Sequence, residues 1–171
     1  MYKVSIIWVC LVAVLQAVNV GDTLPYATLE NESGGTSHNK PWHAKSLKGK
    51  VHLLLYMDPD KREETQELLD AVNVLKVDSK KYSTVAIVNL AATWMPDAIL
   101  KGLLSKKEKE LKNTSFIFDK KKYLVKKWKM KDDASNILIV DKNLKILYQK
   151  VGEVSKKDVN HILKTISDTL K

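Results

Sequence analysis

An apolar run that passes through a polar turn into an amphipathic segment constrains the fold of this chain most strongly. The run VHLLLYM covers residues 51–57, and Asp58, Pro59 and Asp60 follow it directly. Between residues 61 and 76, apolar side chains recur at helical spacing, at Leu68, Leu69, Val72 and Leu75. The pattern predicts a buried strand, a tight turn and a helix, an order in which proteins often place their chemistry.

Further strands are predicted on both sides of this unit. Apolar and β-branched stretches predict strands over residues 83–90, 114–119, 136–141 and 145–152, with Lys142-Asn143 as a hairpin turn between the last two. Near the N-terminus, residues 20–30 predict an extended segment. Residues 31–41, which contain Gly34 and Gly35, predict a turn-rich loop.

Helical spacing predicts three more helical segments, over residues 97–112, 123–131 and 155–170, the last with Ser155 as its N-cap. Strands that alternate with helices and end in a hairpin and a helix predict an α/β fold, with a mixed sheet flanked by helices. The length of 171 residues predicts one domain. We expect the inward-facing side chains of the three segments to be Ile99, Leu100, Leu103, Leu104 and Leu111, then Leu124, Trp128 and Met130, then Val159, Ile162, Leu163, Ile166 and Leu170.

The N-terminus predicts export. After Lys3, the stretch VSIIWVCLVAVLQAV has the length of the hydrophobic part of a signal peptide and is short for a membrane span. We expect residues 1–18 to be a signal peptide cleaved near Ala17, and residues 20–171 to form one domain that is not integral to a membrane. An uncleaved membrane anchor is the alternative, because Leu15 is larger than the residue usual three positions before the cut.

Cysteine content restricts the chemistry of the exported protein. Cys10 is the only cysteine, and it lies within the predicted signal peptide. A mature chain without cysteine can neither form an internal disulfide nor exchange thiols, and it cannot build a zinc site on cysteine ligands. We therefore expect neither thiol–disulfide oxidoreductase nor peroxidase activity.

The basic charge leaves two interpretations open. The net charge is +9, and Arg62 is the only arginine, so 28 of the 29 basic residues are lysines. Dense groups occur only at Lys106-Lys107, Lys120–Lys122 and Lys126–Lys131. The lysines form either a solvated surface or a weak contact with an anionic envelope surface. Specific nucleic-acid binding is not expected, because it favours the planar fork of arginine.

Five segments carry a family resemblance. VGDTLPYATL and SLKGKVHLLLY are similar to the N-terminal part of periplasmic thioredoxin-like domains, and NILIVDKNLKILYQKVGEVSKKDV is similar to their C-terminal half. YSTVAIVNLAATWMPDAIL and SFIFDKKKYLVKKWKMKDDASNILIVDK resemble the YtfJ-type family of bacterial periplasmic proteins. The resemblance covers about residues 20–171 and implies a thioredoxin-like fold and a periplasmic location.

The same resemblance shows what this chain lacks. Redox-active relatives carry their reactive cysteines where this chain has Met57-Asp58-Pro59-Asp60. They also place a cis-proline where this chain has Ala134-Ser135-Asn136. The YtfJ-type family is not defined by a cysteine pair either, so the resemblance leaves its activity open.

Two interpretations fit the acidic turn. Asp58 with Pro59 at the first helical position is a favoured helix start, and Asp60 with Glu63 three residues later is nearly as good. Alternatively, Asp58 and Asp60 serve as acid–base groups or metal ligands of a hydrolase or other metal-dependent enzyme. Calcium loops need further oxygen ligands and a mid-loop glycine, which this turn does not have.

A second candidate segment follows the strand at 83–90. Thr93, Trp94, Met95 and Pro96 either line a ligand pocket at the carboxyl edge of the sheet or pack the loop onto the domain. The spacing of the four histidines, His38, His43, His52 and His161, matches no metal-binding motif. A pair of His38 with His43 is the one combination that could contribute to a metal site. We expect no cofactor.

We therefore expect a non-redox binding module for an envelope protein, a peptide or a small ligand. Its binding face would comprise Asp58, Pro59, Asp60, Thr93, Trp94, Met95, Pro96, Ser135 and Asn136, with the backbone of Ser135 and Asn136 available to pair with an extended peptide. An enzyme based on Asp58 and Asp60, and a cationic protein bound to an anionic surface, are the alternatives.

Overall fold

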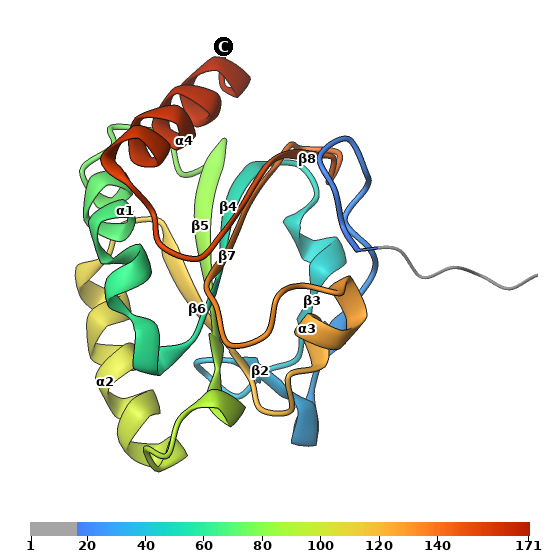
Figure 1. Cartoon of the computed structure of the whole chain (residues 1–171), viewed down its shortest axis with the longest axis vertical. Coiled ribbons are helices and arrows are strands. Elements are labelled where there is room, and N and C mark those ends of the chain that lie inside the picture. Colours follow the sequence, from blue (N-terminus) through green and yellow to red (C-terminus); the bar gives the residue numbers. More distant parts are fainter. Residues whose placement is uncertain (1–16) are drawn as a thin grey trace, which may run out of the picture.

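A six-stranded mixed sheet forms the centre of the molecule (Figure 1). The computed structural model describes residues 17–171. The strands stand in the order β2-β6-β5-β4-β7-β8. Their bounds are β2 Gly34–Thr36, β4 Val51–Met57, β5 Tyr82–Asn89, β6 Thr114–Asp119, β7 Asn136–Val140 and β8 Ile146–Val151.

The sheet contains both parallel and antiparallel strand pairs. Strand β5 pairs in parallel with both β4 and β6, whereas β7 is antiparallel to β4 and to β8. Two short strands, β1 (Thr28–Leu29) and β3 (Trp42–His43), form a separate antiparallel pair. The predicted α/β class and the mixed directions of the strands are therefore confirmed.

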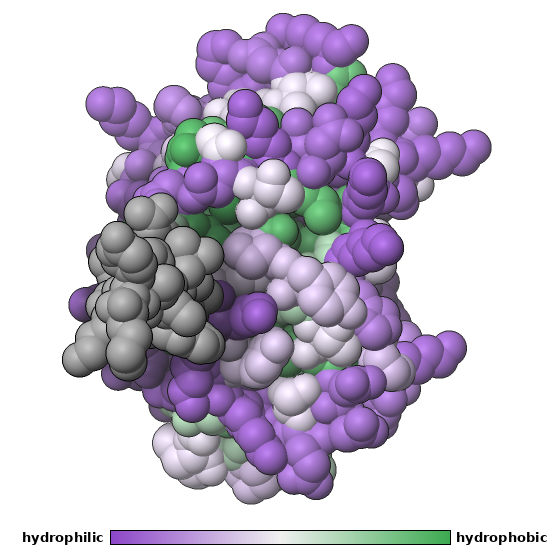
Figure 2. All heavy atoms as spheres, turned by 90° about the vertical axis from the view of Figure 1, so that its right-hand side faces the viewer, coloured by the Kyte–Doolittle hydropathy of each residue, from purple (hydrophilic) through white to green (hydrophobic). Residues whose placement is uncertain are grey.

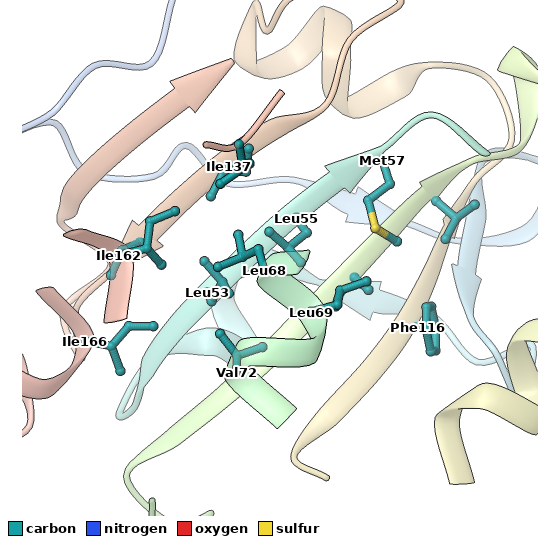
Figure 3. Packing of buried hydrophobic residues seen from close by; sticks show 14 of the residues in the cluster. Leu53, Leu55, Met57, Leu68, Leu69, Val72, Phe116, Ile137, Ile162 and Ile166 are labelled. Atoms are coloured by element: carbon teal, nitrogen blue, oxygen red, sulfur yellow. The ribbon is translucent and has the colours of Figure 1, made fainter. Parts of the chain in front are cut away.

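Helices cover the two faces of the sheet unequally. Helices α1 (Glu63–Asn73), α2 (Asp97–Glu110) and α4 (Lys156–Thr169) lie on one face, and α3 (Tyr123–Trp128) lies on the other with the N-terminal segments (Figure 1). On the first face, Leu53 and Leu55 of β4 pack with Leu68 of α1 and Ile162 of α4 (Figure 3). On the second face, Trp42 and Trp128 meet edge to face with their ring centroids 6.4 Å apart.

Val18 packs against the domain. Val18 is buried and donates its backbone N–H to the carbonyl oxygen of Trp128 at 3.2 Å. It therefore belongs to the packed domain, two positions before the predicted start at residue 20. Residues 1–16, with Cys10 and most of the predicted signal peptide, lie outside the described residues.

The loop predicted at residues 31–41 contains an edge strand. Strand β2 pairs antiparallel with β6, and a Cβ at Gly34 would lie 1.8 Å from the carbonyl oxygen of Phe118. Only glycine permits such a close approach of two backbones, and Gly34 also has a φ of 137°. The glycine pair that predicts a turn is thus what allows the strand to join the sheet.

Only some of the α2 residues that were predicted to face inward are buried. Leu100 is buried, and Leu104 and Leu111 pack against the core, but Ile99 and Leu103 are 56% and 55% exposed. Successive residues of a helix point about 100° apart, so these two project onto a neighbouring face. The sheet packs against only one side of α2, which leaves the other apolar side in solvent.

The hairpin and the last helix follow the prediction. Lys142 and Asn143 lie at the centre of the turn between β7 and β8, in which the N–H of Leu144 donates to the carbonyl oxygen of Asp141 at 2.9 Å. Ser155 caps α4 by accepting a hydrogen bond from the backbone N–H of Asp158. Val159, Ile162 and Ile166 of α4 are buried, and Leu163 and Leu170 are partly buried against the same cluster.

Candidate functional site

The acidic turn after β4 is a helix start. Asp58 is 6% exposed, and its Oδ1 accepts a hydrogen bond from the backbone N–H of Asp60 at 2.9 Å. Pro59 opens a short 3-10 turn, Pro59–Lys61, that leads into α1. The expected cap by Asp58 with Pro59 at the first position is confirmed. The carboxylate therefore satisfies a backbone donor that the helical turn leaves free.

Asp60 has a different role from the one that its spacing to Glu63 predicts. It caps no helix, because α1 has no side-chain cap. Instead, its Oδ1 accepts a hydrogen bond from the Oγ1 of Thr93 at 2.8 Å. Thr93 Oγ1 also accepts one from the backbone N–H of Met95 at 3.2 Å. These two bonds tie the loop after β5 to the turn after β4.

The loop at residues 93–96 divides its side chains between the interior and the solvent. Met95 is half-buried and packs against the core, whereas Trp94 is 87% exposed. Pro96 precedes α2, whose first residue is Asp97. Trp94 therefore does not pack the loop onto the domain, and it stands at the surface beside the turn.

A cavity of about 350 Å³ opens where the turn and this loop meet. Helices α1 and α2 form its sides, and the ends of β4 and β5 with the middle of β6 form its base. Its volume lies at the lower end of the range for small-molecule pockets, about 300–1,000 Å³. The lining residues are Met57, Asp58, Pro59, Asp60, Arg62, Thr65, Gln66, Leu69, Val88, Thr93, Met95, Leu100, Leu103, Leu104, Lys107 and Phe116.

Ser135 and Asn136 do not belong to this surface. They are 0% and 2% exposed, so the expectation that they contribute to a binding face is wrong. The N–H of Ser135 donates to the carboxylate of Glu64 at 2.9 Å, and its carbonyl oxygen accepts from Gly152. Asn136 lies in β7 between β4 and β8. Their backbone groups are therefore already paired and cannot bind an extended peptide.

Two buried groups have strongly shifted pKa values away from the cavity. Burial lowers the pKa of His52 on β4 to about 4, so the imidazole is neutral at physiological pH. Burial and the neighbouring Asp119 carboxylate raise the pKa of the Tyr56 hydroxyl, which donates to that carboxylate at 3.1 Å. Asp119 is fully buried and also accepts from the backbone N–H groups of Tyr123 and Leu124, so it caps α3.

Metal binding gains no support from the geometry. Within residues 17–171, no group of three or more histidine, cysteine, aspartate or glutamate side chains is placed to hold an ion. The Nδ1 of His43 is hydrogen-bonded to Thr28 at 3.0 Å. His38 lines a shallow groove together with Trp42 and His52.

The lysine groups lie on more than one surface. Lys107 lines the cavity, while Lys121 and Lys122 pair with Glu32 and with Asp132 and Asp133. On the side of the molecule that carries α3, hydrophilic side chains form most of the visible surface (Figure 2).

In the described part of the chain, no helix combines the length and the hydropathy that are needed to span a bilayer.

Sequence comparison identifies the family. A model of the family described as "Bacterial protein of unknown function (YtfJ_HI0045)" matches residues 14–169. The chain belongs to this family. It is 24% identical over 140 residues to "Uncharacterized protein YtfJ" of Escherichia coli, covering 77% of this chain and 73% of that one. It is 23% identical over 145 residues to an uncharacterized protein of Haemophilus influenzae, covering 81% and 77%.

Solved structures similar to this family member have the thioredoxin fold. The thioredoxin domain of a thiol-disulfide oxidoreductase from Bacteroides vulgatus superposes with a TM-score of 0.63 at 17% identity, covering 88% of this chain and 99% of that one. A thiol peroxidase from Chromobacterium violaceum gives 0.60 at 15% identity, covering 91% and 90%. At these identities the likeness shows the fold alone, and it confirms the thioredoxin-like fold.

The sequence indicates only part of the cavity. It singles out the two acids, Thr93 and Met95, but it assigns Leu100 and Leu104 to the core and gives Phe116 no role. Arg62 is notable in the sequence only as the single arginine. The exposed position of Leu103 could have been suspected from α2 itself, which has more apolar residues than one face can bury.

Proposed function

We propose that this protein is a non-redox binding module whose ligand occupies the cavity between α1 and α2. One observation carries the proposal: a mostly apolar cavity opens beside the turn at which thioredoxin-like relatives carry their reactive cysteines. Here that turn holds Asp58, Pro59 and Asp60, and no cysteine follows Cys10. The turn keeps its structural role as a helix start while the adjacent cavity provides the binding site.

The position of the two acids favours binding over acid–base catalysis. Asp58 is engaged by the N–H of Asp60, and Asp60 is engaged by Thr93. Both carboxylates thus stabilise the wall of the cavity. A general base has to present a carboxylate oxygen to the substrate, whereas Asp58 is only 6% exposed and the Oδ1 of Asp60 is held by Thr93.

We further propose that the protein acts in the periplasm after export through its N-terminal segment. Support comes from the length of the apolar stretch at residues 4–18 and from Val18, which lies directly after the expected cut at Ala17 and packs against the domain. Mass spectrometry of the protein recovered from the periplasm tests this. A mature N-terminus near Val18 is expected, and an intact chain recovered only with the membrane fraction would indicate an anchor instead.

Chemical-shift mapping tests the binding function. The protein expressed from its full sequence would be titrated with a set of small apolar, anionic and cationic fragments. We expect the backbone amides of Leu100 and Leu104 to shift saturably with at least one fragment class. If no class of fragment shifts these amides, the proposed function is wrong.

Two matched variants separate cavity binding from surface adsorption. Leu103 and Ile99 lie one turn apart on α2 and are equally exposed, but only Leu103 lines the cavity. Leu103→Trp should block the cavity and abolish the shifts, while Ile99→Trp should preserve them. Equal loss in both variants would mean that the fragments bind the exposed face of α2 rather than the cavity. A thiol–disulfide reductase assay on the same samples should show no activity.

A further inference from the structure

The apolar lining of the cavity comes from five different elements. Met57 ends β4, Val88 lies in β5, Phe116 lies in β6, Leu69 belongs to α1 and Leu100 belongs to α2. Met57, Leu69 and Phe116 lie close to one another in Figure 3. Met57 and Met95 contribute flexible, polarisable thioethers, which adapt to irregular apolar ligands better than branched side chains do. The interior therefore suits an alkyl chain better than a rigid polar ligand.

The rim carries a cationic side that is available to a ligand. Arg62 and Gln66 lie one helical turn apart, and the Nζ of Lys107 donates to the Oε1 of Gln66 at 3.1 Å. These three residues therefore form one side of the rim, between α1 and α2. Arg62 is exposed and has no ion-pair partner within residues 17–171.

On the acidic side of the rim, one oxygen of each carboxylate is bonded within the protein. Asp58 holds the N–H of Asp60, and Asp60 holds the hydroxyl of Thr93. Asp58 is also almost fully buried, whereas Arg62 is exposed and has no ion-pair partner in the described part of the chain, so an anionic head meets a guanidinium that is available to it. Arg62 can bind a carboxylate or phosphate through two parallel hydrogen bonds, the geometry for which its side chain is suited.

We propose that the ligand is a single-chain amphiphile with an anionic head, bound with its alkyl chain in the cavity and its head against Arg62 and Lys107. The proposal rests on the binding function above and specifies its ligand class. A cavity of about 350 Å³ has the liquid volume of roughly 12 water molecules at about 30 Å³ each. Methylene groups are of similar size, so a chain of about ten carbons fills it.

Alkyl probes of matched length test the ligand class. The protein expressed from its full sequence would be titrated calorimetrically, below the micellar concentration, with octanoate, decanoate, 1-decanol and decyltrimethylammonium. Each buried methylene should tighten binding by about fourfold, the equivalent of about 0.8 kcal/mol. Decanoate, with two more methylenes, should therefore bind about 15-fold more tightly than octanoate, and at least tenfold more tightly than the cationic probe.

Charge variants test the orientation of the ligand. Arg62→Gln should weaken decanoate binding roughly tenfold and leave 1-decanol unchanged. Lys157→Gln, an exposed lysine on α4 outside the cavity, removes the same charge and should leave both affinities unchanged. Unchanged melting of both variants would show that the fold is intact.

The outcomes distinguish the ligand class from the binding function. The proposal is overturned if decyltrimethylammonium binds as tightly as decanoate, if Arg62→Gln has no effect, or if Leu103→Trp leaves decanoate affinity intact. If fragments shift the cavity amides but no alkyl anion binds, the ligand class is wrong and the binding function stands. If neither fragments nor amphiphiles reach the cavity, both are wrong.

Discussion

Asp58 offers the sharpest test of how the acidic turn works. The aspartate is almost fully buried, and its Oδ1 accepts the backbone N–H of Asp60 at 2.9 Å. Asp58→Ala removes both this acceptor and a negative charge at the start of a helix. Asp58→Asn keeps an oxygen acceptor in the same place and removes only the charge. Comparing the two variants therefore separates the hydrogen bond from the electrostatic contribution.

The expected magnitudes follow from these two contributions. Loss of a side-chain cap lowers the free energy of unfolding by about 0.5–2 kcal/mol, and loss of an acid near a helix N-terminus lowers it by about 0.3–1 kcal/mol. Asp58→Ala should therefore cost about 1–3 kcal/mol, and Asp58→Asn about 0.3–1 kcal/mol. For a domain of this size, 1 kcal/mol shifts the melting temperature by about 2–4 °C.

Urea unfolding followed by circular dichroism measures both variants. Asp97→Ala is the matched control, because Asp97 is an acid in the first turn of α2, a helix without a side-chain cap. It should cost no more than Asp58→Asn. If Asp58→Ala unfolds at the same urea concentration as the unaltered protein, Asp58 does not stabilise the turn, and its buried position would need another explanation such as catalysis.

Three further predictions concern groups outside the cavity. Burial lowers the pKa of His52 from 6.5 to about 4, so the unfolded chain binds the proton before the folded chain does as the pH falls. The free energy of unfolding should therefore drop by roughly 2 kcal/mol between pH 7 and pH 5. His52→Gln should abolish that part of the pH dependence. Asp119→Ala should lower the free energy of unfolding by about 3–5 kcal/mol in urea titrations, because it leaves the donors of Tyr56 and of the α3 N-terminus without their acceptor; a loss below about 1 kcal/mol would contradict this. Gly102 lies on the exposed side of α2, and no atom lies within 4 Å of the Cβ that Gly102→Ala would add. The variant should raise the free energy of unfolding by about 0.5–1 kcal/mol and with it the melting temperature, whereas a lower melting temperature would show that the site is strained.

Local patterns predicted most of the elements of this fold. The apolar run at 51–57 and the helical spacing after it correspond to β4 and α1, and Ser155 caps α4 as its position indicates. Such features depend on residues within a few positions of one another. The family resemblance added the thioredoxin-like arrangement, which periodicity alone cannot specify.

The errors arise where backbone geometry or one-sided packing decides. Gly34 is part of a strand because β6 approaches it closely, and a glycine-rich stretch gives no local sign of that partner. Ile99 and Leu103 are exposed because the sheet covers only one side of α2. Ser135 is buried because Glu64 and Gly152 take its backbone groups.

By itself, the sequence determined that the turn after β4 contains no thiol and that Asp58 with Pro59 starts a helix. Both follow from residue identity and from contacts between near neighbours. Only the tertiary structure decided that Asp60 bonds to Thr93, 33 positions later, and that a cavity opens beside them. The cavity depends on how α1 and α2 pack over the ends of the strands, and this packing brings together side chains that no local pattern connects.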